Sequence, residues 1–301
     1  MDTKSKIILI SGPTASGKSD FAVKFAKKIN GEIINADSMQ VYKQLKILTA
    51  RPIKKHKKNI KHHLYGIIDA KTNFSTGEWL KLALEKINEI KKRKKVPILV
   101  GGTGLYFNAL VNGLVKIPNI PMKFRNKIRL MQKKYGQKRF YKNLLKSDPK
   151  VKNKIDSNDA QRSIRAFEIK SYTKKSMYDW ISQTRPHFKS NEFLKIYLNF
   201  DRDKLIEKIN KRTNQMIKLG AVNEVKKLNT LKISQQLSVN KVIGVQELTK
   251  YLEKKITINE AKQLISIRTR QYAKRQATWA RSKMASWIKV NSKDFPAWLK
   301  K

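Results

Sequence analysis

Residues 12–19, with the sequence GPTASGKS, fit the phosphate-binding pattern G-x-x-x-x-G-K-[ST]. An apolar run at residues 7–10 precedes the pattern and residues with helical periodicity follow it, so a strand and a helix flank it as the motif requires. Backbone N–H groups at a helix N-terminus, together with one lysine, bind polyphosphates. Lys18 would place its charge on the phosphates and the Ser19 hydroxyl would reach Mg²⁺. The candidate phosphate ligands are Gly12, Pro13, Thr14, Ala15, Ser16, Gly17, Lys18 and Ser19.

The motif alone leaves three chemistries open. The phosphate could be a group to be transferred, a fuel to be hydrolysed, or a leaving group whose departure activates a carbon. The same pattern is typical of ATP-binding proteins, so ATP is one candidate ligand.

A carboxylate follows the second predicted strand, which covers residues 32–36 and ends at Asp37. Ligands of parallel sheets bind at the C-terminal ends of strands, so Asp37 is expected close to the phosphate-bearing ligand. Asp37 or Ser38 could equally cap a helix over residues 39–42, which is an ordinary use of these residue types. Position alone does not separate catalysis from capping.

Arginine is informative in this chain because only 14 of its 68 basic residues are arginine. Four of them fall within residues 268–281, which have helical character. At about 100° per residue, one face of that helix carries Arg268, Tyr272, Arg275 and Trp279. The opposite face carries Arg270, Lys274 and Arg281. Cations on both faces predict that one face docks on the protein and the other meets phosphates, whereas the simpler alternative is a solvated basic helix.

The elements that must position these residues alternate between strands and helices. A third strand over residues 97–100 ends in the glycine turn of residues 101–104, and another strand is expected over residues 193–198. Apolar strands with intervening helices predict an α/β fold, a P-loop NTPase-like parallel sheet covered on both faces. We assign residues 1–117 and 188–301 to this core, with helices from residue 202 onward. Residues 118–187 are predicted to form an inserted helical domain.

The composition limits the class of protein. The formal net charge is +46, which favours a polyanion such as nucleic acid as partner. There is no cysteine, no apolar run long enough to span a membrane and no signal-peptide pattern, so we expect a cytoplasmic protein. The four histidines lack helical metal-ligand spacing, and His62 and His63 are expected at a strand end or in a loop.

Two rival functions use the same loop. A small-molecule or nucleotide kinase would bind ATP there, and a nucleic-acid-binding ATPase or RNA-binding module would use the basic surface. An ATPase needs an apolar strand that ends in an acidic residue, but the third strand ends in Gly-Gly-Thr. A pure binding module needs no phosphate loop beside Asp37.

The chain resembles the tRNA dimethylallyltransferases, also called isopentenyl-tRNA transferases, over nearly its whole length. The motifs that carry the resemblance are GPTASGKS, ADSMQVYK, TARP, HHLYGIID, VPILVGGTGLYFNAL, DSNDAQRSIRAFEI, RTNQMIKLGAVNEV and TRQYAKRQATWAR. They occur in the order found in that family.

The resemblance implies a prenyl transfer. A dimethylallyl group would pass from dimethylallyl diphosphate to N6 of the adenosine immediately 3′ of the anticodon, tRNA position 37, in tRNAs that read codons beginning with U. Residues 12–19 and Arg212 would hold the diphosphate with Mg²⁺ on Ser19. Asp37 would accept the N6 proton or hold the amine. The family is monomeric.

The resemblance also implies the residues that contact the tRNA anticodon stem-loop. They are Asp37, Ser38, Met39, Gln40, Thr103, Arg125, Gln161, Arg162, Ser163, Ile164, Arg165, Lys274, Arg275, Gln276, Ala277, Thr278, Trp279, Ala280 and Arg281. The helical insertion would grip the tRNA. Arg162 and Arg165 share a face after a predicted helix start at residues 158–159, although Asp159 could simply pair with Arg162.

Overall fold

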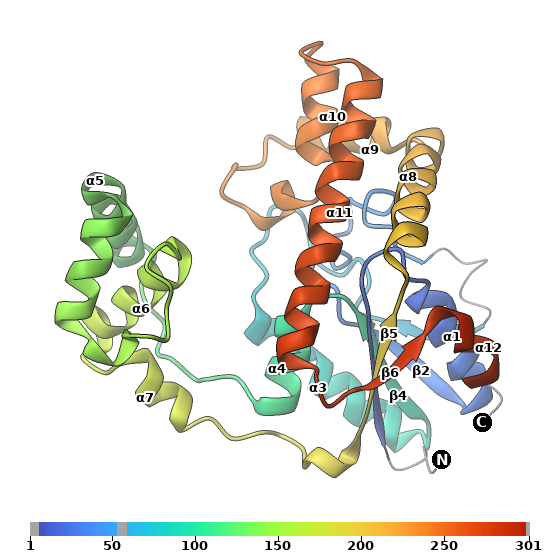
Figure 1. The fold of residues 1–301 in the computed structure, drawn as a ribbon, viewed down its shortest axis with the longest axis horizontal. Coiled ribbons are helices and arrows are strands. Elements are labelled where there is room, and N and C mark those ends of the chain that lie inside the picture. Colours follow the sequence, from blue (N-terminus) through green and yellow to red (C-terminus); the bar gives the residue numbers. More distant parts are fainter. Residues whose placement is uncertain (1–5, 53–58, 299–301) are drawn as a thin grey trace. The chain divides into compact units, whose positions relative to one another are not determined.

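The computed structural model describes residues 6–52 and 59–298, which fold as two compact units. The first unit consists of the described parts of Met1–Ala109 and Phe188–Lys301, and the second is Leu110–His187 (Figure 1). We expected the insertion to begin at residue 118, but the second unit begins at Leu110, inside helix α4 (Gly104–Asn112). Within the described residues, no helix is long and apolar enough to span a membrane.

The core of the first unit is a six-stranded sheet in which every paired strand is parallel, as the sequence predicts. Its order is β3-β2-β4-β1-β5-β6. In chain order the strands are β1 (Ile7–Ser11), β2 (Gly31–Asn35), β3 (His62–His63), β4 (Val96–Gly101), β5 (Phe193–Asn199) and β6 (Ile288–Asn291). β1, β2 and β4 are buried throughout, which explains the mostly apolar sequences of β1 and β4, whereas β2 also buries Glu32 and Asn35.

The strand register brings the predicted loops together. Ser11 lies opposite Gly101, and Asn35 lies opposite Val100, so β1, β2 and β4 end at the same edge of the sheet. The loops after these three strands therefore converge, as expected for a ligand site of a parallel sheet.

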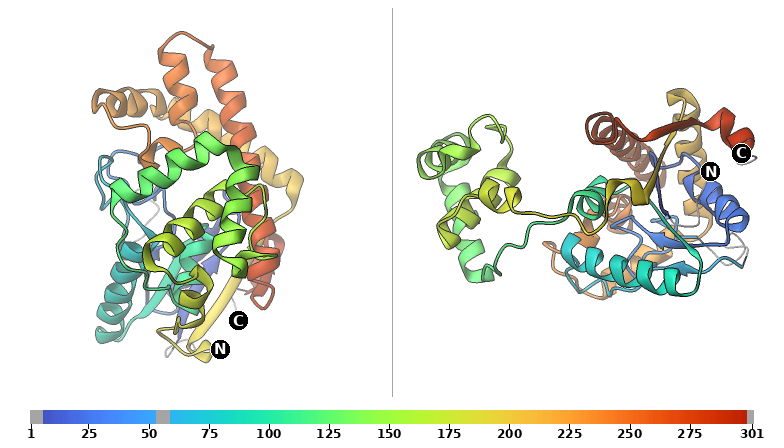
Figure 2. Two further views of the ribbon diagram at one scale, coloured as in Figure 1. Left: turned by 90° about the vertical axis from the view of Figure 1, so that its left-hand side faces the viewer. Right: turned by 90° about the horizontal axis from the view of Figure 1, so that it is seen from below.

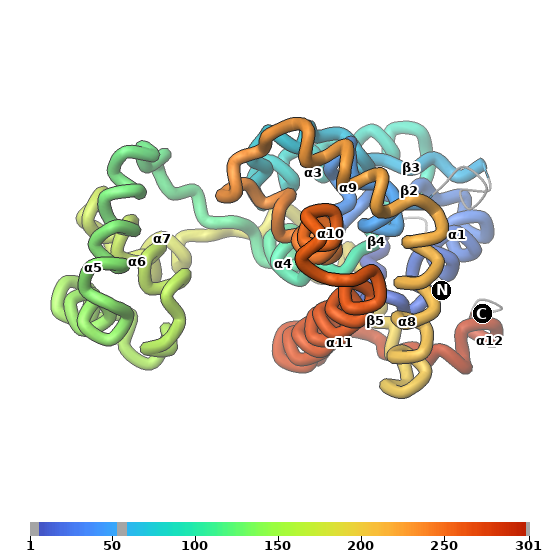
Figure 3. Tube along the Cα trace, turned by 90° about the horizontal axis from the view of Figure 1, so that it is seen from above, coloured from blue at the N-terminus to red at the C-terminus, as the bar shows by residue number. Residues whose placement is uncertain are grey.

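Helices complete the first unit (Figures 1 and 3). Their bounds are α1 (Lys18–Lys28), α3 (Thr76–Lys92), α4 (Gly104–Asn112), α8 (Arg202–Lys218), α9 (Ala221–Thr230), α10 (Val245–Leu252), α11 (Ile258–Lys283) and α12 (Phe295–Trp298). Capping boxes start α3 at Ser75 and α11 at Thr257, where a Glu three residues later returns the bond. α10 and α11 run side by side, and α8 packs on α11.

One element departs from the prediction that only helices follow residue 202. β6 pairs with the outer side of β5, with Val290 opposite Leu198. Of its four residues only Val290 is buried, because this edge strand covers the core with one side chain. A single buried position gives no alternating pattern, so the sequence shows no strand there.

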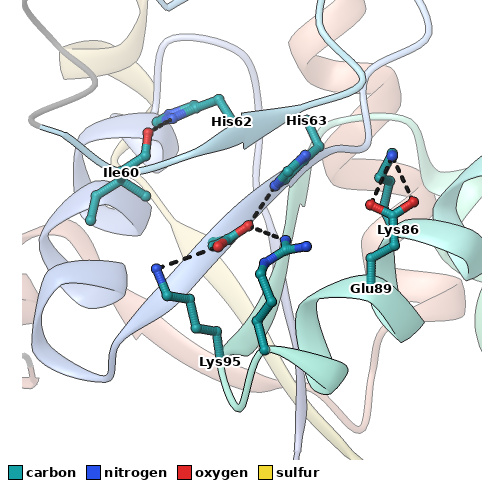
Figure 4. Close-up of polar contacts among 8 residues, drawn as sticks. Ile60, His62, His63, Lys86, Glu89 and Lys95 are labelled. Carbon is teal, nitrogen blue, oxygen red and sulfur yellow. Dashed lines mark hydrogen bonds and ion pairs between the residues drawn. The ribbon is translucent and has the colours of Figure 1, made fainter.

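A buried carboxylate fixes the beginning of β2 (Figure 4). Glu32 is 1% exposed and accepts hydrogen bonds from Arg93 Nη2 and from His63 Nε2, both at 2.7 Å. Lys95 Nζ lies 3.4 Å from its other oxygen. Burial alone would raise the pKa of Glu32, but the bonds from Arg93 and His63 outweigh it and lower the pKa to about 2. His63 thus lies in a short strand, as predicted, and anchors β3 to β2.

The second unit is helical and contains α5 (Met122–Ser147), α6 (Ala160–Thr173) and α7 (Met177–Ser182). α5 and α6 pack against each other (Figure 2). Gly136 interrupts α5 with φ 71°, a left-handed conformation that glycine adopts without steric cost. The core of this unit includes Leu144, Val151 and Ala166.

Candidate active site

The converging loops border a cavity of about 1110 Å³ in the first unit. Its walls come from the loops after β1, β2 and β4 and from helices α8 and α11. The predicted site residues that line it are Gly12, Thr14, Ala15, Gly17, Lys18, Ser19, Asp37, Ser38, Met39, Gln40, Thr103, Arg212, Arg275, Gln276 and Trp279. The structure therefore gathers the phosphate loop, the carboxylate and one face of the C-terminal helix around one space.

The phosphate loop is held in a conformation suited to an anion. Ala15 and Gly17 have φ of 64° and 83°, and α1 starts directly after them. A non-glycine residue in this region is uncommon and marks functional turns. Ser16 Oγ is buried without a hydrogen-bond partner among the described residues. An unpaired buried hydroxyl at a helix N-terminus fits a phosphate oxygen as its missing partner.

Two cations flank the loop. Lys18 Nζ donates to the Pro13 carbonyl at 3.2 Å, and Arg212 Nη1 on α8 donates to Thr14 Oγ1 at 3.2 Å. Burial lowers the pKa of Lys18 to about 8, with Asp37 opposing and Arg212 reinforcing that shift. Burial likewise lowers the pKa of Arg212. Partly desolvated cations gain most from an anionic ligand, so this geometry favours a diphosphate.

Asp37 does not cap a helix. Residues 38–52 contain turns, bends and an isolated β-bridge at Tyr42 but no helix, so the predicted alternative of a helix over residues 39–42 is wrong. Asp37 Oδ1 accepts a hydrogen bond from the Met39 N–H at 2.9 Å, which closes a local Asx-type turn instead. Oδ2 takes no hydrogen bond from the described residues, and the side chain lines the cavity. One carboxylate oxygen thus positions the residue and the other is available to a ligand.

Asn35 holds the Asp37 backbone, a role that the sequence did not reveal. Asn35 is fully buried, accepts from the Asp37 N–H and donates from Nδ2 to the Asp37 carbonyl, both at 2.9 Å. An amide directly after the apolar pair Ile33 and Ile34 of a buried strand was the available signal, because a buried polar group needs defined partners.

The glycine turn after β4 contacts the loop after β2. Thr103 Oγ1 accepts from the Ser38 N–H at 2.9 Å, and the Thr103 N–H donates to the Ala36 carbonyl at 3.2 Å. A Cβ on Gly101 would collide with the Ala36 backbone, so this approach requires glycine. Burial, reinforced by Asp37, raises the pKa of Tyr272 on α11, which bonds Thr103 and Gln276.

Gln276 connects the C-terminal helix to two of these loops. Its Oε1 accepts from the Thr14 N–H at 2.8 Å, and its Nε2 donates to the Gly102 carbonyl at 2.9 Å. Trp279, one turn later, covers Gly104, where a Cβ would collide with the indole. The helix therefore docks on the site by this face, which excludes the alternative of a purely solvated helix. Whether Gln276 also meets tRNA remains a prediction.

The remaining predicted contacts on α11 lie outside the cavity. Lys274, Thr278 and Arg281 are exposed, and Arg281 Nη2 donates to Thr278 Oγ1 at 3.1 Å. Ala277 is half-buried. Ala280 is only 6% exposed, so a direct tRNA contact by its side chain does not fit this structure.

The other predicted tRNA-binding residues belong to the second unit. Asp159 caps α6 and pairs with Arg162, so the pairing alternative is correct for that arginine. Gln161 is exposed, whereas Ile164 is half-buried. Ser163 is fully buried and accepts a hydrogen bond from Gln137, so its side chain is not accessible to tRNA here.

Arg125 and Arg165, the last two of that group, both bond the buried carboxylate of Glu168. Nothing in the sequence singles out Glu168, because an acid on a basic helix carries no sign of its burial.

No group of three or more His, Cys, Asp or Glu side chains that could hold a metal occurs within residues 6–52 and 59–298. The hydroxyl of Ser19, which lines the cavity, would supply one hard oxygen ligand beside the loop. Such a sparse set suits Mg²⁺, which keeps several waters and is held largely by the phosphates of its substrate.

Comparisons with known proteins agree on one family. The profile of the IPP transferase family matches residues 40–283. A tRNA dimethylallyltransferase of Pelagibacter ubique (strain HTCC1062) is 66% identical over 301 residues, which is 100% of this chain and 96% of that protein.

Two solved structures share the fold. A tRNA isopentenylpyrophosphate transferase from Bacillus halodurans has a TM-score of 0.71 at 33% identity, covering 98% of this chain and 95% of that one. A eukaryotic dimethylallyltransferase, described as acting on tRNA, has a TM-score of 0.84 at 30% identity, covering 97% and 75% of the two chains.

Proposed function

Because the chain belongs to the IPP transferase family, we propose that it transfers a dimethylallyl group from dimethylallyl diphosphate to N6 of the adenosine immediately 3′ of the anticodon. The substrates are tRNAs that read codons beginning with U, and the modified base is at tRNA position 37. The products are N6-dimethylallyladenosine and diphosphate. The observation that carries the proposal is one cavity that holds a phosphate loop with two partly desolvated cations and, beside them, a carboxylate with an available oxygen.

The diphosphate is the leaving group. Negative charge develops on the oxygen that joined the allylic carbon to the α-phosphate as the carbon–oxygen bond breaks, and fixed cations near that oxygen lower the barrier. Lys18 and Arg212 would supply this charge, and the backbone N–H groups of Ala15 and of residues 17–19 would bind the phosphate oxygens.

Asp37 receives the proton from the acceptor amine. The N6 lone pair of adenine is delocalised, so the amine needs a base or a hydrogen-bond acceptor as the new N–C bond forms. Oδ2 of Asp37 is available for this, because Oδ1 is occupied by the Met39 N–H. The target base must leave the helical stack to reach this oxygen.

Mg²⁺ is the metal that these residues would accept, bound to the Ser19 hydroxyl and to diphosphate oxygens. When bound, it neutralises the charge of the departing diphosphate.

The tRNA would be held by the second unit and by the exposed cations of α11. The described acids of the second unit are few, whereas its lysines and arginines are many, and this imbalance favours a phosphate backbone. We propose that the protein acts as a monomer in the cytoplasm, where tRNA is available. Light scattering of the purified chain tests the monomer.

The decisive experiment measures transfer of label from radiolabelled dimethylallyl diphosphate to an anticodon stem-loop RNA with an A-A-A run after the second anticodon base. Asp37→Asn should lower kcat by about 10²–10⁴ and leave RNA affinity within about twofold of the parent. Asp203→Asn, an exposed acid on α8, is the matched control and should retain full turnover. ATP-dependent phosphorylation without prenyl transfer would refute the proposal.

A further inference from the structure

The second unit contains a buried carboxylate surrounded by three arginines. Glu168 on α6 is 1% exposed. Its Oε2 accepts from Arg125 Nε and from Arg165 Nη1, each at 3.2 Å, and Arg129 Nε lies 3.8 Å from Oε1. Arg125 and Arg129 are one turn apart on α5, so two helices contribute to the cluster (Figure 2).

The three guanidinium groups keep most of their hydrogen-bonding capacity. Their side chains are 32%, 40% and 39% exposed for Arg125, Arg129 and Arg165. Each guanidinium has five N–H donors in a planar fork that matches the oxygens of a phosphate. Each arginine directs one nitrogen at Glu168, and Arg125 Nη1 also donates to Met122 Sδ at 3.8 Å, so the remaining nitrogens are left for a ligand at the surface.

One negative charge does not balance three positive ones. None of the other acids of this unit, all of which the structure describes, pairs with these three arginines: Asp148 is buried, Asp156 accepts from the Asn158 N–H, Asp159 pairs with Arg162, and Asp179 pairs with Lys150. The cluster therefore carries a net charge of about +2 at the surface, where only an external anion can neutralise it. Without Glu168 the guanidinium groups would repel one another and separate.

We propose that Glu168 assembles Arg125, Arg129 and Arg165 into one binding site for RNA phosphates. Glu168 acts as a positioning residue: it holds the inward-facing nitrogen of each guanidinium group and leaves the outward-facing nitrogens to the phosphates of the RNA backbone. Family resemblance predicted two of these arginines at tRNA, but it predicted neither Arg129 nor the organising role of a buried acid. The proposal rests on the proposed function only in so far as RNA is the ligand.

In the test, charge alone and our proposal predict opposite changes in RNA affinity. Glu168→Gln makes the protein more positive, so charge alone predicts tighter RNA binding. Our proposal predicts the opposite: the Kd for the anticodon stem-loop RNA rises roughly tenfold as charge-assisted hydrogen bonds lose their geometry. The slope of log Kd against log salt should fall by about 0.7–0.9 for each phosphate that the variant no longer binds. The KM for dimethylallyl diphosphate and kcat at saturating RNA should not change.

Asp179→Asn is the matched control. It removes an acid of the same unit, from an exposed pair with Lys150, and therefore adds the same charge without touching the cluster. This variant should bind RNA as tightly as the parent or more tightly. If Glu168→Gln also binds as tightly as the parent, with an unchanged salt slope, the proposal is overturned.

A second variant covers the case in which Glu168→Gln fails to fold, as judged by circular dichroism. Arg129→Gln removes a partly exposed group that lies 3.8 Å from Glu168, beyond hydrogen-bond distance, so folding is preserved. It should weaken RNA binding roughly threefold and reduce the salt slope by about 0.7–0.9. Unchanged binding would contradict the proposal. RNA affinity is measured without the donor, so a parent protein that binds RNA but transfers no prenyl group would refute the proposed function alone.

Discussion

Glu32 in the sheet unit and Glu168 in the helical unit are both 1% exposed and each lies among three basic side chains, but the two acids bind them differently. Glu32 takes two bonds of 2.7 Å, from Arg93 and His63. Glu168 takes two of 3.2 Å, and its third arginine stays at 3.8 Å. The short bonds of the first cluster hold strands together. The longer ones of the second leave the guanidinium groups available to a ligand.

The amino acids of the two clusters fit this difference. Around Glu32 the basic groups are an imidazole, a guanidinium and an ammonium, which share few geometric features. Around Glu168 all three are guanidinium groups, which bind phosphate in the same planar, bidentate way. A buried acid among cations is therefore not by itself a sign of structure or of function. The N–H donors that the acid leaves unused on the surrounding side chains decide whether the cluster is structural or binds a ligand.

The largest effect is expected at the first cluster. Glu32→Gln leaves Arg93, Lys95 and His63 without a counter-charge beside the sheet. Breaking a buried ion pair costs about 3–5 kcal/mol, and the partial exposure of these cations reduces this to about 2 kcal/mol, a factor of about 30 in the unfolding equilibrium. Urea unfolding of the parent and of the variant measures this loss of stability. RNA binding by the folded variant should be unchanged, and a loss of RNA affinity would remove the distinction between the clusters.

Lys18 forms no ion pair with a carboxylate of the described residues. The binding of an anionic ligand should therefore be coupled to the protonation of the Lys18 ammonium group. Its pKa is about 8, and the protonated form binds diphosphate. The Kd for inorganic diphosphate should therefore rise with pH above 8, by up to about tenfold per unit. Lys18→Arg stays charged and shows only the titration of diphosphate itself. Isothermal calorimetry at pH 7, 8 and 9 compares the two, and identical pH profiles would contradict this account.

Acid should weaken the Glu32 cluster in a defined window. The folded pKa of Glu32 is about 2, below the unfolded value of 4.5, so the unfolded chain binds more protons between these values. The stabilisation is complete above pH 4.5 and is lost as the pH falls toward 2. Stability measured from about pH 5 to about pH 2.5 should fall less steeply for Glu32→Gln than for the parent. If the stability of the parent and of the variant fell in parallel with pH, other carboxylates would dominate the acid dependence.

The smallest effect is expected next to the first cluster, at the exposed pair of Lys86 and Glu89 (Figure 4). Their 2.8 Å contact is nearly as short as the bonds of Glu32, but both side chains are accessible to water. Such pairs contribute little because solvent screens them. Glu89→Gln should leave the midpoint of thermal unfolding within experimental error. A large shift would show that bond length outweighs burial.

The sequence predicted the elements whose signals are local. The phosphate loop, the strands over residues 32–36, 97–100 and 193–198, and the cap at Asp159 each depend on neighbouring residues. β6 was not predicted, because one buried valine makes no alternating pattern. The Asp37 turn was ambiguous because the same side chain caps helices and closes Asx-type turns.

The contacts that complete the site join residues far apart in the chain. Gln276 bonds Thr14 across 262 positions, and Arg93 bonds Glu32 across 61. No local pattern encodes such pairs. A glutamate inside the apolar run of residues 31–34 indicates that cations must surround it, but it does not indicate which.

The bond between Gln276 and Thr14 sets an order of assembly during synthesis. A ribosome delivers the phosphate loop first, Arg212 after two thirds of the chain, and the amide that fixes the Thr14 N–H only near the end. A nascent or prematurely terminated chain that lacks α11 therefore carries the complete motif without the contact that shapes it. The protein therefore completes this site only after α11 has been synthesised, 262 positions beyond Thr14.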